Sequence, residues 1–259
     1  MNLLHVCCAP DLVSSVLKRE ELKHSMLLFY NPNIYPEEEF FKRYHAFRRV
    51  CQEMGVECPE PDYSPEDFSA IHDSFEDEPE GGMRCTKCIE LRLRKAAEAA
   101  KSLGAKSFST TLLASPQKPI YLICQIGQKV SESFDLEFIS ENLRLERGKL
   151  NQFLGNVYVQ NYCGCKSSLK EIVQTREIKK RRDKEALERD FSCFADLWRF
   201  RGAVISRSSI PVEEVSVLKE LITLIKPCAL LDDVEDVSLQ GKRWLKTGSY
   251  NCRIIREKK

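Results

Sequence analysis

The stretch that decides the fold is Leu3-Leu4-His5-Val6-Cys7, followed directly by Cys8-Ala9-Pro10-Asp11. The first run is mostly apolar and predicts a buried strand, and the apolar positions of residues 11–22 recur on one side and predict a helix. The same alternation continues, with strands expected at residues 25–30 and 107–111 and helices at 36–54 and 85–103. Strands that alternate with helices are typical of a mostly parallel sheet, so we expect an α/β fold.

The regular alternation ends after Cys165. A long charged helix is expected over residues 169–189, and the segment beyond it alternates less regularly. We therefore predict two parts in this chain of 259 residues, namely residues 1–180 and an appended, partly helical segment at 181–259.

The charge of the chain is unevenly distributed. Residues 166–259 carry 21 Lys and Arg against 15 Asp and Glu, whereas residues 1–165 carry 19 against 24. The run Lys179-Lys180-Arg181-Arg182 concentrates the basic excess. Such a run is either a solvated helix face or a patch that contacts the phosphates of a nucleic acid.

The composition describes a globular protein, with 42% hydrophobic and 31% charged residues. The longest stretch without a charged residue, 24–36, has 13 residues, and a membrane-spanning helix needs about 20. The first residues also lack the basic and apolar regions of a secretory signal. We therefore expect a cytoplasmic protein with no membrane partner.

Twelve cysteines are many for a cytoplasmic enzyme, and six of them form clusters. In a reducing compartment, clustered cysteines bind metal or perform redox chemistry more often than they form structural disulfides. The clustered residues are Cys7, Cys8, Cys85, Cys88, Cys163 and Cys165.

Two of these pairs are expected at one edge of the sheet. Cys7 and Cys8 follow the first strand, and Cys85 and Cys88 begin a helix, where thiolates share one face and are favoured by the helix N-terminus. Four converging thiolates suit an iron–sulfur cluster or zinc, and thiol-based redox chemistry is a third interpretation. We favour the cluster, because adjacent cysteines make a poor zinc knuckle and a structural zinc has no reason to occupy this edge.

The segment Cys163-Gly164-Cys165 differs from the other pairs. A disulfide that spans one residue is strained and easily reduced, which suits electron transfer. Two neighbouring thiolates equally suit a metal, and a plain surface loop is the third interpretation. Asp11 either caps the first helix or acts as a ligand or proton donor beside the cluster. The four histidines form no metal-binding pattern, and no nucleotide-binding glycine loop is present.

Five short motifs follow one another in a characteristic order. They are Leu4-His5-Val6-Cys7-Cys8-Ala9-Pro10, Tyr30-Asn31-Pro32-Asn33-Ile34, Glu80-Gly81-Gly82-Met83-Arg84-Cys85, Thr110-Thr111-Leu112 with Ser115-Pro116, and Tyr162-Cys163-Gly164-Cys165. This order resembles that of the epoxyqueuosine reductase QueH family over roughly residues 1–175. The resemblance implies a Rossmann-like, PP-loop or HUP-like three-layer sandwich. It also implies the last step of queuosine biosynthesis, in which epoxyqueuosine in tRNA is reduced without cobalamin and with a [4Fe-4S] cluster.

The resemblance also implies roles for the cysteines. Cys7, Cys8, Cys85 and Cys88 would hold the cluster, and Cys163 and Cys165 would form the redox-active pair. Asp11 stands where the family motif usually has cysteine. A carboxylate at this position could protonate an oxygen, or could bind an additional iron together with Cys163 and Cys165. The Asp-Phe-Lys-Lys and Arg-Ser motifs that the family usually carries are missing from residues 142–156.

The implied substrate is large, because the modified base lies in the anticodon loop of a tRNA and must be splayed into the site. Tyr30 and Tyr35 are expected to stack on the base, and Asn31, Asn33 and Arg84 are further substrate-binding candidates. A separate electron donor is expected. Two other functions stay open: a PP-loop tRNA sulfur-transfer enzyme, although its ATP loop is missing, and a zinc-stabilised RNA-binding module without catalysis.

Overall fold

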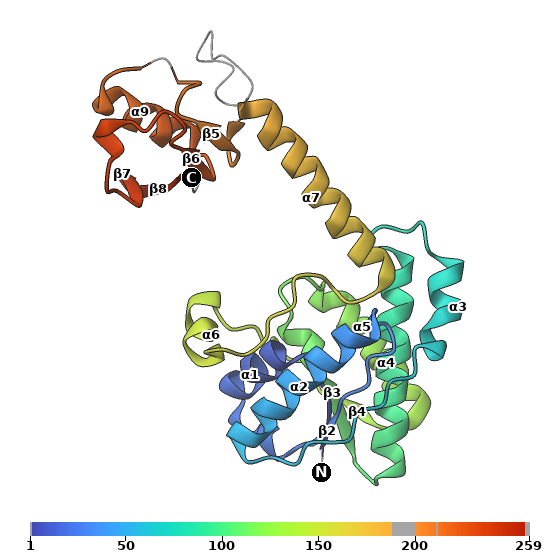
Figure 1. Ribbon diagram of the computed structural model, residues 1–259. Coiled ribbons are helices and arrows are strands. Elements are labelled where there is room, and N and C mark those ends of the chain that lie inside the picture. The colour runs from blue at the N-terminus through green and yellow to red at the C-terminus, as the bar shows by residue number, and fades with distance from the viewer. Residues whose placement is uncertain (1, 188–199, 211, 257–259) are drawn as a thin grey trace. The chain divides into compact units, whose positions relative to one another are not determined.

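The computed structural model describes residues 2–187, 200–210 and 212–256 (Figure 1). The chain divides into two compact units, Met1–Glu171 (unit 1) and Ile172–Lys259 (unit 2). The division falls within helix α7 (Lys166–Leu187), the long helix that the sequence predicted. Except for Arg181, the side chains of the basic run at 179–182 lie outside the described residues.

Unit 1 is built on four parallel strands. They are β1 (Asn2–His5), β2 (Met26–Leu28), β3 (Ser107–Thr110) and β4 (Glu137–Phe138), in the order β2-β1-β3-β4. Leu4 of β1 pairs with Leu27 on one side and with Ser109 on the other. The prediction of an α/β fold with a parallel sheet is therefore confirmed. Because β1 is followed by β2 on one side and has β3 on the other, its carboxyl end is the point where ligands bind in open α/β sheets.

The helices of unit 1 form two groups by contact. Helix α4 (Met83–Ser102) packs on β1 and β3 and against α5 (Ile120–Phe134) and α3 (Glu66–Ser74). Helix α1 (Ala9–Lys18) packs against α2 (Glu37–Met54) and α6 (Arg147–Leu154). A short 3₁₀ turn, η2 (Thr111–Ala114), follows β3 and contacts α1.

The prediction of one helix over residues 11–22 is wrong in one respect, because this segment forms two separate elements. Helix α1 ends at Lys18, and a 3₁₀ turn, η1 (Glu20–His24), follows it. Arg19 separates them with an extended backbone at φ −140° and ψ 92°. The beginning of α1 is as the sequence suggests, because Pro10 lies in its first turn, where a missing N–H costs nothing.

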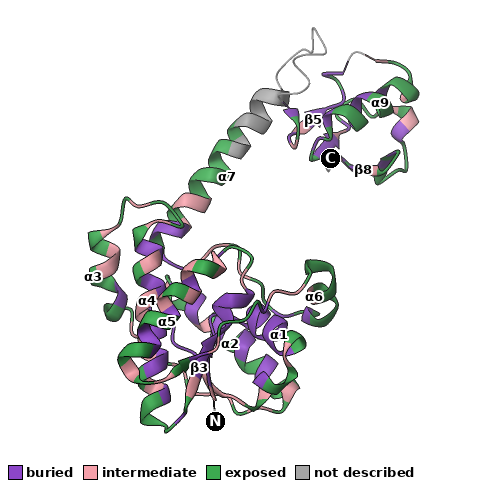
Figure 2. Cartoon of the chain, turned by 180° about the vertical axis from the view of Figure 1, so that it is seen from behind, coloured by how far each residue is buried: buried purple, intermediate pink, exposed green. Residues whose placement is uncertain are grey.

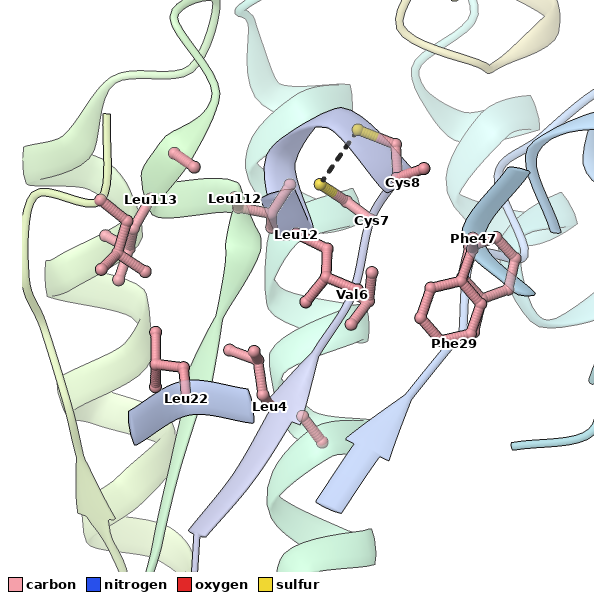
Figure 3. Packing of buried hydrophobic residues seen from close by; sticks show 14 of the residues in the cluster. Leu4, Val6, Cys7, Cys8, Leu12, Leu22, Phe29, Phe47, Leu112 and Leu113 are labelled. Carbon is pink, nitrogen blue, oxygen red and sulfur yellow. Dashed lines mark hydrogen bonds between the residues drawn. The ribbon is translucent and has the colours of Figure 1, made fainter. Parts of the chain in front are cut away.

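The core of unit 1 lies on both sides of β1 (Figures 2 and 3). Leu4 and Val6 are fully buried, and Phe29 stacks on Phe47 with ring centroids 4.9 Å apart. Gly127 in α5 lets the helix approach β4, since a Cβ at this position would lie 2.2 Å from the ring of Phe138. The sheet is therefore closely packed on both faces, which places the segments that follow β1 and β3 against a buried core.

Unit 2 contains a second sheet, which the sequence did not predict. Its strands are β5 (Val204–Ser206), β6 (Ala229–Leu231), β7 (Trp244–Thr247) and β8 (Tyr250–Ile255), in the order β5-β6-β8-β7. The first three in this order are parallel, and β7 runs antiparallel to β8. Helix α9 (Val215–Ile225) packs on β7. A 3₁₀ turn, η4 (Val237–Leu239), lies between β6 and β7 in the chain. Among the described helices of both units, none has the length and apolar character needed to cross a membrane.

Candidate functional site

The first thiol group lies where β1 meets α1. The sulfur of Cys7 is 3.0 Å from an Asp11 carboxylate oxygen and 4.0 Å from the sulfur of Cys8 (Figure 3). Thr111, the first residue after β3, accepts the backbone N–H of Cys7 at 3.0 Å and contacts its sulfur at 3.1 Å. The two sulfurs and the carboxylate oxygen lie within 4.8 Å of one another, so this group can hold one metal ion.

Asp11 does not cap helix α1. The N-cap residue is Cys8, and no side chain caps the first turn of this described helix. Burial raises the pKa of Asp11, and the hydrogen bonds from Cys7 and Cys8 oppose the shift. Burial also raises the pKa of Cys7, with its neighbours Cys8 and Asp11 adding to the effect. Of the two interpretations of Asp11, the structure therefore favours the ligand or proton donor.

The second thiol group lines a cavity at the start of α4. Cys85 and Cys88 come from the first turns of this helix, and Cys163 and Cys165 come from the segment before α7. The sulfur of Cys85 accepts the backbone N–H of Gly81 at 3.2 Å. Burial raises the pKa of Cys88 to about 11, although the charge of Arg92 opposes this. The other lining residues are Asn33, Phe68, Arg84, Ile89, Arg92 and Lys118.

Cys163 and Cys165 have different surroundings. The ammonium group of Lys118 lies 3.0 Å from the sulfur of Cys163 and 3.2 Å from a carboxylate oxygen of Glu80. Burial lowers the pKa of Lys118, but its interactions with Cys163, Cys85 and Glu80 together outweigh this effect, and the pKa is raised. Cys165 is buried, and its sulfur accepts the backbone N–H of Ser168 in the first turn of α7 at 3.4 Å. The half-buried Cys163 is thus the member of the pair that faces a cation.

The turn between these cysteines is clamped by Arg43. Its two terminal nitrogens donate to the carbonyl oxygens of Cys163 at 2.9 Å and Tyr162 at 3.1 Å. Its Nε donates to Glu39 at 2.8 Å, and both partners of this ion pair are buried. Gly164 has φ +136°, and a Cβ at this position would lie 3.1 Å from Arg43. Only glycine therefore fits this turn without strain.

Two buried cations connect the thiol groups. Arg92 is 4% exposed, and its only direct hydrogen-bond acceptors among the described residues are the Cys88 carbonyl at 3.3 Å and Asn31 at 3.5 Å. Burial lowers the pKa of Arg92. The interactions with thiols of both groups, of which Cys88 has the largest effect, together outweigh burial, so the pKa is raised. Lys118 likewise acts on Cys163, on Cys85 and on Asp11. Among the described residues, no carboxylate forms an ion pair with Arg92, so its charge faces the thiols of both groups.

Comparisons with known proteins identify the family to which this site belongs. A family model described as "Epoxyqueuosine reductase QueH" matches residues 2–171, which is most of the chain. The chain belongs to the epoxyqueuosine reductase QueH family. The matched segment ends where unit 1 ends.

Relatives named epoxyqueuosine reductase QueH support this assignment. The protein from Thermotoga maritima is 39% identical over 178 residues, which cover 65% of this chain and 90% of the relative. The protein from Helicobacter pylori is 34% identical over 180 residues, covering 65% of this chain and 49% of that protein. The protein from Staphylococcus epidermidis is 29% identical over 193 residues, covering 69% and 80%.

The predicted substrate-binding residues of this QueH-family chain differ in their surroundings. Tyr30 is 1% exposed, its hydroxyl donates to Asp67 at 2.6 Å, and Lys95 covers its ring, so a base cannot stack on it in this structure. Asn31 is also buried and donates to the carbonyl of Val6 at 2.9 Å, which is a structural role.

The other three substrate candidates lie closer to the solvent or to the cavity. Tyr35 is 46% exposed. Asn33 and Arg84 line the thiol cavity, and each has one buried polar atom, Oδ1 and Nε respectively, without a partner in the described structure. Sequence patterns did not indicate Arg43, Arg92 or Lys118. The only sequence signal for Lys118 is its place three residues after Ser115 in the fourth motif.

Proposed function

We propose that this chain reduces epoxyqueuosine in tRNA to queuosine, the last step of queuosine biosynthesis. Membership of the QueH family supports the reaction. The observation that carries the proposal is the arrangement of the six motif cysteines in two groups that share the buried cations Arg92 and Lys118. We retain the Rossmann-like three-layer sandwich as the proposed class of unit 1, since the strand order β2-β1-β3-β4 and the two helix groups agree with it.

We infer that Cys7, Cys8, Cys85 and Cys88 hold a [4Fe-4S] cluster. The donor set fits, because all four sulfurs are buried thiols, and thiolate is the ligand that such clusters require. The surroundings fit as well. A cluster bound by four thiolates is anionic, and Arg92 supplies a buried positive charge that no described carboxylate neutralises. When bound, the cluster would supply electrons one at a time.

Cys163 and Cys165 are proposed to supply both electrons and both protons of the reduction. Oxidation of the two thiols to a disulfide releases two electrons and two protons. These break the two carbon–oxygen bonds of the epoxide, leave a carbon–carbon double bond and convert the oxygen to water. An external electron donor must then return two electrons, with two protons, to restore the dithiol. The ammonium group of Lys118 lies 3.0 Å from the sulfur of Cys163, where it can donate a proton to the epoxide oxygen and recover one from the thiol.

An additional iron is the second candidate for this chemistry. We predicted from the sequence that this iron would be bound by Asp11, Cys163 and Cys165. There it would polarise the epoxide oxygen as a Lewis acid. In the structure, the carboxylate of Asp11 groups with Cys7 and Cys8. This grouping supports a metal-binding role for Asp11. It does not join Asp11 to the Cys163–Cys165 pair, so we place the disulfide version first.

Tyr35, Asn33 and Arg84 are proposed to hold the base. Tyr35 is the exposed ring on which a splayed base can stack. Asn33 and Arg84 offer, from inside the cavity, one acceptor and one donor that have no described protein partner. Buried polar atoms are costly when they are unpaired, so these atoms suit hydrogen bonds to the substrate.

Anaerobic purification tests the proposal. A broad absorption near 400 nm that dithionite bleaches, with about four irons and four sulfides per chain, is expected. The reduced protein should convert epoxyqueuosine in tRNA to queuosine, measured by mass spectrometry of the digested nucleosides. Cys163→Ser should abolish turnover, whereas Cys228→Ser, at an exposed cysteine outside the motifs, should not. A colourless protein with stoichiometric zinc would refute the reductase and favour the RNA-binding module.

A further inference from the structure

We propose that unit 2 binds RNA through the open face of its β7–β8 hairpin, and that this RNA is a loop of the tRNA substrate. The identification of this RNA as the tRNA substrate rests on the proposed function, whereas RNA binding by this face does not. The family model ends at residue 171, so nothing in the family match assigns a role to unit 2.

The two strands alternate strictly between a buried and an exposed face. Trp244 pairs with Arg253 across the hairpin, and Lys246 pairs with Asn251. These four residues are all exposed, which places them together on one face of the hairpin. The residues between them are buried in the core of unit 2, where helix α9 packs on β7; they are Leu245, Thr247, Cys252 and Ile254.

The open face joins an aromatic ring to positive charge. The side chain of Trp244 is 52% exposed, an unusual state for a large ring whose burial is favourable. Residues 237–256 contain five Lys and Arg and no Asp or Glu. Of these five, Arg256 pairs with Asp232 at 3.0 Å. Among the described residues, no carboxylate lies within ion-pair distance of Lys246 or Arg253.

This combination fits single-stranded RNA better than a protein. An exposed ring on which a base stacks, flanked by cations that contact the backbone phosphates, is the usual design of single-strand binding surfaces. Protein interfaces are depleted of lysine, whereas Lys246 lies on the same face as Trp244 and Arg253 lies directly opposite the ring. A base can stack on Trp244 only when it is unpaired, so the face suits a loop rather than a duplex.

The test uses the full chain and three fluorescently labelled RNAs: tRNA carrying epoxyqueuosine, an unmodified tRNA, and a single-stranded oligonucleotide. Fluorescence anisotropy gives the dissociation constant of each. Trp244→Ala should weaken binding about 5- to 100-fold, and Trp244→Phe, which keeps a ring, should restore most of it. The double variant Lys246→Gln with Arg253→Gln should reduce the slope of log affinity against log salt by about 1.4, since each phosphate contact to a single strand contributes about 0.7.

Lys226→Gln is the matched control. Lys226 is an exposed cation of the same unit at the C-terminal end of helix α9, so its loss removes one positive charge outside strands β7 and β8. It should leave the affinity for all three RNAs within about twofold. All the substituted side chains are exposed, so the variants should keep the unfolding temperature of the wild type, which thermal circular dichroism checks.

The outcomes separate this inference from the proposed function. If no epoxyqueuosine is reduced but Trp244→Ala still weakens RNA binding, the RNA-binding face stands and the reductase assignment fails. If Trp244→Ala and the double variant bind all three RNAs like the wild type, the face is not an RNA site, whatever the reductase assay shows. An equal loss in Lys226→Gln would also overturn it, because the effect would then follow total charge rather than this face.

Discussion

Replacing Arg43 with lysine should loosen the turn that carries the proposed redox pair. Arg43 donates three hydrogen bonds, to Glu39 and to the carbonyl oxygens of Tyr162 and Cys163. Lysine keeps the charge but has a single nitrogen, so it can keep the ion pair with Glu39 and lose both carbonyl contacts. Hydrogen bonds from a charged group contribute about 1.5–3 kcal/mol each. The free energy of unfolding of unit 1 should therefore fall by about 3 kcal/mol or more.

Two measurements distinguish a clamp from general support of the fold. Urea unfolding gives the loss of stability, and the rate at which iodoacetamide alkylates Cys163 in the folded, metal-free protein reports local opening of the turn. Arg49→Lys is the matched control on the same helix, because Arg49 pairs with Glu53 at 2.8 Å but both side chains are half exposed. An exposed pair contributes at most about 1 kcal/mol. Equal stability and equal alkylation rates in the two variants would refute the clamp.

Three further predictions test the site and its support. Asp11→Ala should lower the iron content by about one ion per chain if Asp11 binds an additional iron, and unchanged iron and turnover would discard that metal. Gly164→Ala should cost about 1–3 kcal/mol of unfolding free energy, because φ is +136°, whereas Gly148→Ala, which meets nothing within 4 Å, should cost none. Burial, aided by the charge of Arg92, lowers the pKa of His5 to about 3. The unfolded chain therefore binds this proton below about pH 6.5 and the folded chain does not, so acid destabilises the wild type. Relative to His5→Gln, the wild type should lose about 2 kcal/mol between pH 7 and pH 5 in urea titrations, and parallel curves would exclude His5 as the cause.

The parallel sheet of unit 1 was predictable because its central strand is an apolar run. Leu3 and Leu4 are buried on both faces of the sheet, and such strands carry a continuous signal that needs no partner to be recognised. The placement of Cys7 and Cys8 after this strand follows from the same run. The sheet of unit 2 escaped prediction because its strands are short: β5 and β6 have three residues each, and β7 has four, too few for a clear alternation of polar and apolar residues.

The residues that support the site could not be predicted, for a different reason. Glu39 and Arg43 are four residues apart on α2, a spacing typical of exposed helix pairs, yet both are buried. Their burial depends on the segment around Cys163, 120 residues away from Arg43 in the chain. The prediction that Tyr30 stacks on the base was wrong for the opposite reason. It lies in a loop motif that suggests exposure, but Asp67 and Lys95, from distant helices, take its hydroxyl and cover its ring.

Two buried cations, Arg92 and Lys118, act on both thiol groups. A buried guanidinium is expensive unless its charge is compensated, and the groups that act on Arg92 are thiols of both groups, Cys7 and Cys88 among them. Lys118 has the same relation to Cys163 and Asp11. Burial nevertheless raises the pKa of Cys7, Cys85 and Cys88, so folding alone favours their protonated thiols. A metal centre bound by these cysteines would have to displace their protons, and its thiolate ligands would bring the negative charge that no described carboxylate offers to Arg92.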